Sequence, residues 1–60
     1  MKICVGEEHT LAALNRVKWV QTTFDSSVYK FTVEGFLIND YYIEFFDDKY
    51  ATLYYLQFPK

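Results

Sequence analysis

The sequence predicts an α+β fold, in which one N-terminal helix packs on an antiparallel β-meander of three to four strands. Three observations predict it. Aromatic residues make up 22% of the 60 residues, and almost all of them lie at or after Phe24. Aromatic and β-branched residues favour strands. The one stretch with helical apolar spacing precedes this aromatic part, and clusters of turn-forming residues divide the aromatic part into segments.

Residues 7–18 are the predicted helix. Leu11, Leu14 and Val17 recur at helical spacing and form an apolar stripe that we expect to cover the sheet. Acidic residues at the start and basic residues at the end of this segment suit the helix dipole. Thr10 is an alternative N-cap, which would delay the start of the helix by about two or three residues.

The remaining chain is expected to be extended. Val20 and its β-branched neighbours either extend the helix or begin a strand that runs to Phe24. Turns are predicted where Asp, Ser, Glu and Gly cluster, at residues 25–27, 34–35 and 47–48. The segments between and beside these turns are a short strand or extended lead-in at 2–5, then strands at 28–33, 36–46 (bent at Asn39-Asp40) and 50–58.

The turn at Asp47-Asp48 would set the register of the last two strands. A two-residue turn there places Tyr42 opposite Leu53, and aromatic residues then lie on both faces of the sheet. One helix covers one face only, so the face that carries Tyr42 is expected to stay partly exposed. A register shifted by one residue would exchange the two faces, and a sheet that coils into a barrel would cover both.

This exposed face is the predicted partner-binding surface. Tyrosine combines a large apolar ring with a hydroxyl and is frequent at interfaces. Carboxylates beside the rings would steer a basic partner surface toward them. The candidate partner-binding residues are Tyr42, Glu44, Phe46, Tyr55, Asp40, Asp47 and Asp48.

The sequence contains no pattern typical of an enzyme, a metal site or a cofactor site. Cys4 is the only cysteine and His9 the only histidine, whereas a structural zinc needs four ligands. A Cys4–His9 dyad would also need an orienting acid and a closed pocket, which 60 residues hardly provide. We therefore expect a non-enzymatic protein with no catalytic residues, no metal and no cofactor.

The net charge and the number of cysteines indicate which cellular compartment and which classes of partner suit this protein. The formal net charge is −2, and acids outnumber bases in the aromatic half, which argues against binding to nucleic acid. No apolar run approaches the roughly 20 residues that span a bilayer, and from residues 1–8 we expect no signal segment. A single cysteine is typical of a reducing compartment, so we expect a cytoplasmic protein forming one domain over residues 1–60.

Two function classes fit these observations. The first is a protein-binding module, an inhibitor or adaptor that docks a larger protein through an acidic, tyrosine-rich sheet surface. The second is a self-associating structural subunit, a homodimer in which the same surface meets its symmetry mate. Binding of single-stranded nucleic acid ranks third. In size, acidity and lack of catalytic groups the chain resembles the small host-targeting inhibitors of phages and other mobile elements, a resemblance of type that rests on no motif.

Overall fold

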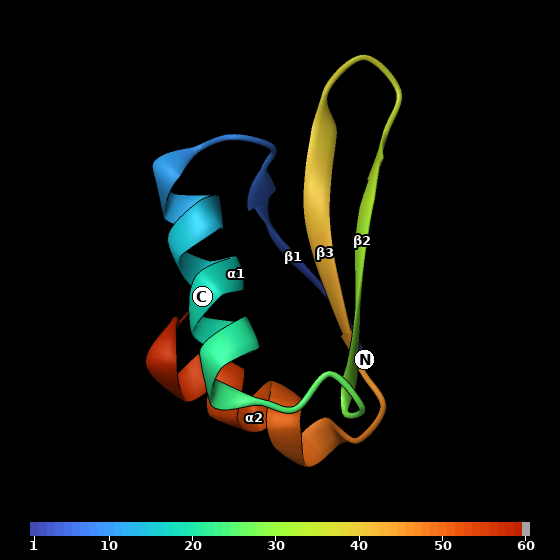
Figure 1. Ribbon diagram of the computed structural model, residues 1–60. Coiled ribbons are helices and arrows are strands. Elements are labelled where there is room, and N and C mark those ends of the chain that lie inside the picture. The colour runs from blue at the N-terminus through green and yellow to red at the C-terminus, as the bar shows by residue number, and fades with distance from the viewer. Residues whose placement is uncertain (60) are drawn as a thin grey trace.

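The computed structural model describes residues 1–59, which form a three-stranded antiparallel sheet and two helices (Figure 1). The elements in chain order are β1 (Lys2–Glu7), α1 (Leu11–Thr23), β2 (Tyr29–Gly35), β3 (Asn39–Phe45) and α2 (Asp48–Gln57). The strands are ordered β1-β3-β2, so the last strand in sequence lies in the middle. The α+β class and the antiparallel sheet are therefore confirmed.

Three features of the predicted architecture are wrong. Strand β1 precedes α1, so the helix is not the first element. The sheet is not a meander, because α1 connects β1 to β2 and both of these strands pair with β3. A fourth strand is absent from the described residues, since the segment predicted as strand 50–58 lies mostly in helix α2.

Helix α1 begins later than the main prediction and uses the alternative cap. Thr10 is the N-cap, and its hydroxyl oxygen accepts a hydrogen bond from the Ala13 N–H at 3.3 Å. Ala13, Val17 and Val20 are buried, at spacings of one and two helical turns. Of the predicted stripe only Val17 is buried, while Leu11 and Leu14 are exposed, because the face turned to the sheet is centred on Ala13, Val17 and Val20.

Helix α2 replaces the expected last strand. Asp47 is its N-cap and accepts a hydrogen bond from the Lys49 N–H at 3.0 Å, so the predicted turn residue caps a helix. Ala51 and Tyr54 are both buried. A spacing of three residues puts them on one face of a helix but on opposite faces of a strand. Burial of this face overrides the strand preference of the tyrosines.

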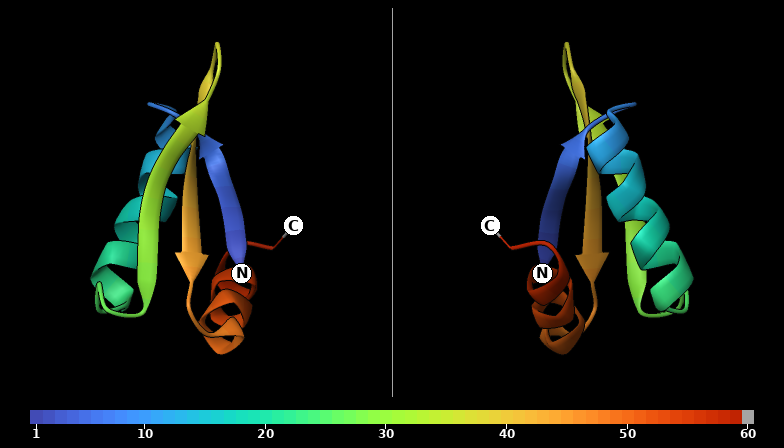
Figure 2. Two further views of the ribbon diagram at one scale, coloured as in Figure 1. Left: turned by 90° about the vertical axis from the view of Figure 1, so that its right-hand side faces the viewer. Right: turned by 90° about the vertical axis from the view of Figure 1, so that its left-hand side faces the viewer.

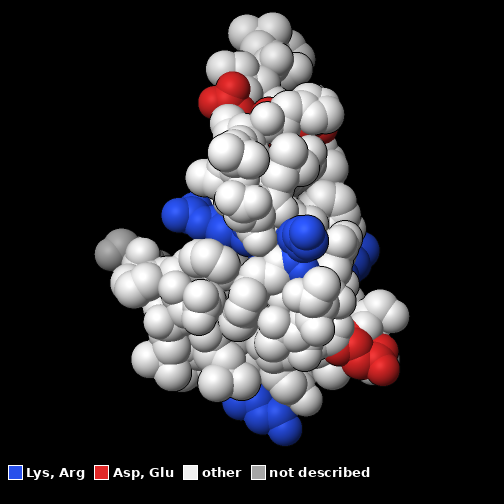
Figure 3. All heavy atoms as spheres, turned by 60° about the vertical axis from the view of Figure 1, so that its left-hand side comes forward, with Lys and Arg blue, Asp and Glu red and all other residues white. Residues whose placement is uncertain are grey.

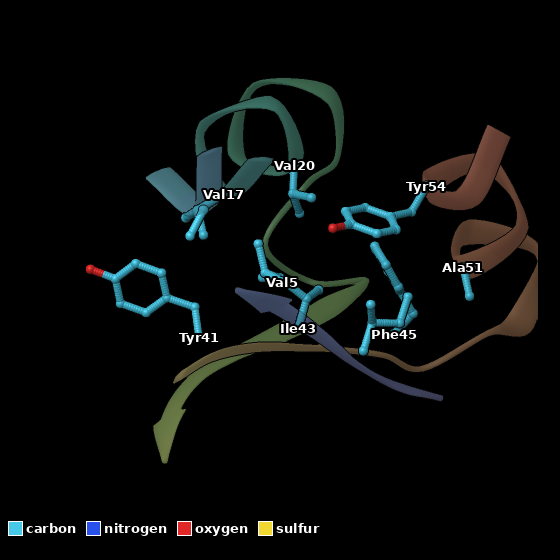
Figure 4. Close-up of a cluster of buried hydrophobic side chains, with 10 residues drawn as sticks. Val5, Val17, Val20, Tyr41, Ile43, Phe45, Ala51 and Tyr54 are labelled. Atoms are coloured by element: carbon cyan, nitrogen blue, oxygen red, sulfur yellow. The ribbon is translucent and has the colours of Figure 1, made fainter. Parts of the chain in front are cut away.

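The core lies between one face of the sheet and both helices (Figures 2 and 4). Tyr41, Ile43 and Phe45 alternate along β3 and are all buried on this face. Figure 4 shows Val17 and Val20 reaching toward them from α1 and the Tyr54 ring entering from α2. The middle strand therefore supplies the floor of the core, and each helix covers part of it.

Burial of Tyr54 gives the protein an expected alkaline limit. Burial raises the pKa of the Tyr54 phenol above its ordinary value of 10.0. As pH rises above about 10, the unfolded chain releases this proton more readily than the folded protein, so the free energy of unfolding falls. Tyr54→Phe removes this titration. We expect its urea midpoint to fall less than that of the parent between about pH 8 and pH 11. Equal losses would show that Tyr54 does not set this limit.

Candidate functional site

Three consecutive exposed apolar residues sit at the tip of the β2–β3 hairpin, and two of them are the most exposed large apolar residues of the described part of the chain. Phe36, Leu37 and Ile38 are 96%, 89% and 62% exposed. They form the three-residue loop after the last ladder pair, Gly35 with Asn39. Figures 1 and 2 show this loop projecting beyond the end of β1 and beyond both helices. We call these three residues the apolar tip.

A row of carboxylates crosses the sheet just below the apolar tip. Asp40 on β3 lies directly opposite Glu7 on β1 and Glu34 on β2. Directly opposed residues of neighbouring strands share a face, so these three acids lie side by side on one face of the sheet. Like charges in such positions destabilise a sheet. Glu34 is paired with Lys2, so the repulsion in this row falls mainly between Glu7 and Asp40.

The β1–α1 loop adds a fourth acid near the base of the tip. The Glu8 N–H donates to the Asn39 carbonyl oxygen at 2.9 Å, which ties this loop to the start of β3. His9 follows in a left-handed conformation with φ of 67°, and its Nε2 lies 3.3 Å from Glu8 Oε1. Figure 3 shows acidic atoms directly beneath the white atoms of the projecting end. We call Glu7, Glu8, Glu34 and Asp40 the acidic collar.

One member of the acidic collar is already ion-paired. Glu34 pairs with Lys2 and accepts a hydrogen bond from the Thr32 hydroxyl at 3.1 Å. The hydrogen bond from Lys2 lowers the pKa of the Glu34 carboxyl, and the same bond raises the pKa of Lys2. Both side chains are about half exposed, so solvent screens the pair and it adds little stability.

The outer face of the sheet, turned away from the helices, carries part of the predicted partner-binding set. Asp40, Tyr42 and Glu44 alternate along β3 on this face. The Lys2 ammonium lies 4.8 Å from the centre of the Tyr42 ring. The neighbouring Cys4, when ionised, raises the pKa of the Tyr42 phenol. Tyr42 is the only aromatic ring among the residues paired on this face, so the face is not tyrosine-rich.

The rest of the predicted set lies elsewhere. Tyr55 is on α2, where its ring meets the Tyr54 ring edge to face with the ring centres 5.6 Å apart. Phe46 is exposed just after β3, and Asp47 caps α2. Asp48, in the first turn of α2, lies 3.9 Å from the Met1 ammonium. The predicted sheet pairing that brought Tyr55 beside Tyr42 is wrong, because residues 48–57 are helical.

The sequence does not predict the apolar tip, because Glu34-Gly35 by itself fits a complete hairpin turn. That turn makes residues 36–38 the start of the predicted strand 36–46. The sequence does hold a signal for the tip. Turn-forming residues stand on both sides of the three apolar residues, Glu34-Gly35 before and Asn39-Asp40 after.

Comparison of the chain with protein-family models, curated proteins and solved structures finds no match. Within residues 1–59, no three or more His, Cys, Asp or Glu side chains gather in a way that could hold a metal ion. No helix of that part of the chain is long and apolar enough to cross a membrane.

Proposed function

We propose that this protein is a non-enzymatic protein-binding module that docks a larger protein by inserting its apolar tip into an apolar socket with a basic rim. The observation that carries the proposal is the exposure of three consecutive large apolar residues at the end of a projecting hairpin. Such exposure is unfavourable in water and is expected where a partner covers it.

The apolar tip has enough surface to anchor a complex. Removing a large apolar side chain from water contributes about 1.5–3 kcal/mol. Phe36 and Leu37 are almost fully exposed, so nearly all of that gain is still available to a partner. A few well-buried side chains carry most of the affinity in many interfaces. A socket that encloses these two residues would therefore supply the main part of the binding free energy.

The acidic collar supports a protein partner over a membrane or nucleic acid. Anionic lipid surfaces and phosphate backbones attract Lys and Arg. The residues around the base of the tip are instead Glu7, Glu8, Glu34 and Asp40. A basic rim around the partner's socket would offset the repulsion among these acids and would speed association. This is the chemistry expected of an inhibitor or adaptor that acts on a larger basic protein.

The proposal is tested by capture with matched variants. For this experiment an affinity tag is added at the C-terminus. A tag at the N-terminus would disturb the hydrogen bond that the Met1 ammonium donates to the Phe45 carbonyl oxygen at 2.8 Å. Proteins retained from native host cells are identified by mass spectrometry, and the affinity of each purified candidate is measured. We expect Leu37→Asp to weaken binding about a hundredfold with no change in thermal stability.

Leu56→Asp is the matched control, because Leu56 is also exposed but lies on α2. It should leave affinity within about a factor of two. Tyr42→Ala and Tyr55→Ala test the other surfaces. A partner that tolerates Leu37→Asp but loses affinity with Tyr42→Ala docks on the outer sheet face, and the tip proposal is then wrong.

A further inference from the structure

We propose that a second copy of this chain binds the free edge of β2, with the two β2 strands antiparallel about a two-fold axis at Thr32. The two sheets then form one continuous sheet across the dimer. This surface shares Glu34 with the acidic collar but does not include the apolar tip, and the proposal stands independently of the proposed function. It rests on the hydrogen-bonding direction of β2, the charges along it and its half-exposed apolar residues.

Strand β2 has a row of backbone groups that point away from its neighbour. The Phe46 N–H donates to the Val28 carbonyl oxygen at 3.1 Å, which marks that pair as hydrogen-bonded in the β2–β3 ladder. Bonded pairs recur at every second residue of an antiparallel ladder. The N–H and C=O groups of Tyr29, Phe31 and Val33 therefore point to the free edge of the sheet. Unpaired edges of this kind are templates for another strand.

These outward groups restrict the possible registers. In a two-fold pair, only residues with outward groups can exchange hydrogen bonds, so an axis at Thr32 bonds Phe31 to Val33 of the partner subunit. The same register sets Lys30 opposite Glu34 of the partner subunit, twice by symmetry. An axis at Phe31 sets Lys30 opposite Thr32 and leaves Glu34 beyond the paired strands. An axis at Val33 sets Glu34 opposite Thr32 and leaves Lys30 beyond the paired strands. Of these three registers, only the one with its axis at Thr32 places a basic side chain opposite an acidic one.

The Thr32 register also completes the row of carboxylates on the outer face. Within one chain, Glu7, Asp40 and Glu34 follow one another across the sheet, and Lys2 of β1 already pairs with Glu34. The partner subunit's Lys30 would extend the row beside Glu34. On the core face, Phe31 and Val33 are 39% and 43% exposed, and each would pack against the other across the axis. The Thr32 register thus adds an opposite-charge pair on the outer face and apolar contacts on the core face.

The other edge of the sheet is less suited to pairing. Strand β1 shifts register between Cys4 and Gly6, and such bulges bend a strand and disrupt regular pairing. The Arg16 guanidinium also donates to the Val5 carbonyl oxygen at 2.9 Å. Helix α1 packs against β1 and α2 against β3, and Figure 2 shows β2 at the lateral edge of the sheet. The β2 edge is therefore the regular and accessible one.

Charge exchange between two variants tests the proposal. Lys30→Glu and Glu34→Lys each place like charges opposite one another in the dimer, so each alone should dissociate about tenfold more readily than the parent. Mixed together, they regain both opposite-charge pairs and should form a one-to-one heterodimer with affinity near that of the parent. Sedimentation velocity from about 10 μM to 1 mM, with native mass spectrometry of the mixture, measures this.

Two further variants guard against a misleading result. Val33→Pro removes an outward N–H but no bond to β3, so it should abolish the dimer while keeping the circular dichroism spectrum. Leu37→Asp changes the apolar tip only and should leave the dimer intact. A parent that stays monomeric at about 1 mM overturns the proposal. So does a mixture of the charge variants that associates no better than either variant alone.

Discussion

Phe45→Ala is expected to leave the protein largely unfolded at 37 °C, whereas Phe46→Ala is expected to leave it folded. Phe45 is 1% exposed, and its ring lies 5.3 Å from Phe24 and 6.4 Å from Tyr50, centre to centre. Truncating such a ring costs about 3–5 kcal/mol. A domain this small has a total stability of only a few kcal/mol. The single change therefore removes most of what holds the fold.

Phe46 provides the control because it is the next residue, has the same side chain and is 65% exposed. Its truncation should change the free energy of unfolding by less than about 1 kcal/mol. Urea titrations followed by circular dichroism at 10 °C and 37 °C separate the two variants. Similar losses for both would mean that Phe45 is not the centre of the core.

Gly35→Ala is expected to disrupt the hairpin and to displace the apolar tip. Gly35 has a φ of 159°, and a Cβ built there meets the Ile38 carbonyl oxygen and lies 2.7 Å from the Asn39 Cα. Both obstacles are backbone atoms, so no side chain can move aside. The loop must take another conformation, at a cost of about 1–3 kcal/mol. Tip-dependent binding should fall by more than this loss of stability alone explains.

Backbone NMR provides the direct measurement for Gly35→Ala. Amide shifts should change through residues 34–40, while those of α1 and α2 stay close to the parent. Asn39→Ala is the matched control, since Asn39 is exposed, lies opposite Gly35 in the ladder and has the extended backbone of β3, which Ala adopts without strain. Unchanged shifts of Leu37 and Ile38 in Gly35→Ala would refute the idea that the tip depends on this glycine.

The sequence pattern predicts an element correctly where its apolar residues recur at the spacing of that element and are the residues it buries. Tyr41, Ile43 and Phe45 alternate, and β3 buries them on one face. Residues 48–57 could not be assigned in this way. Their tyrosines favour strands intrinsically, and the helix is stabilised by contacts of Tyr54 with rings distant in sequence, such as Trp19 at 6.3 Å. Such tertiary contacts are not visible in a single sequence.

The sequence did not single out the apolar tip, and the pairing that it predicted around Asp47-Asp48 is wrong. Acidic residues beside exposed aromatic and apolar residues were expected, and Phe36 with the acidic collar has that character. The error came from two turns. Reading Asp47-Asp48 as a hairpin turn brought Tyr55 next to Tyr42, and reading Glu34-Gly35 as a complete turn hid Phe36 in a strand. Two local choices of turn thus moved the predicted surface to another part of the molecule.

The strand order also sets the sequence of folding events. The Met1 ammonium and the Phe45 carbonyl oxygen that it contacts are 44 positions apart in the chain, whereas β2 and β3 are joined by three residues. Short loops close far faster than long ones, so the β2–β3 hairpin is expected to form within microseconds and β1 to dock in a later, slower step. The segment that displays Phe36 and Leu37 would then be the first part of the sheet to acquire its shape, ahead of the strand that completes it.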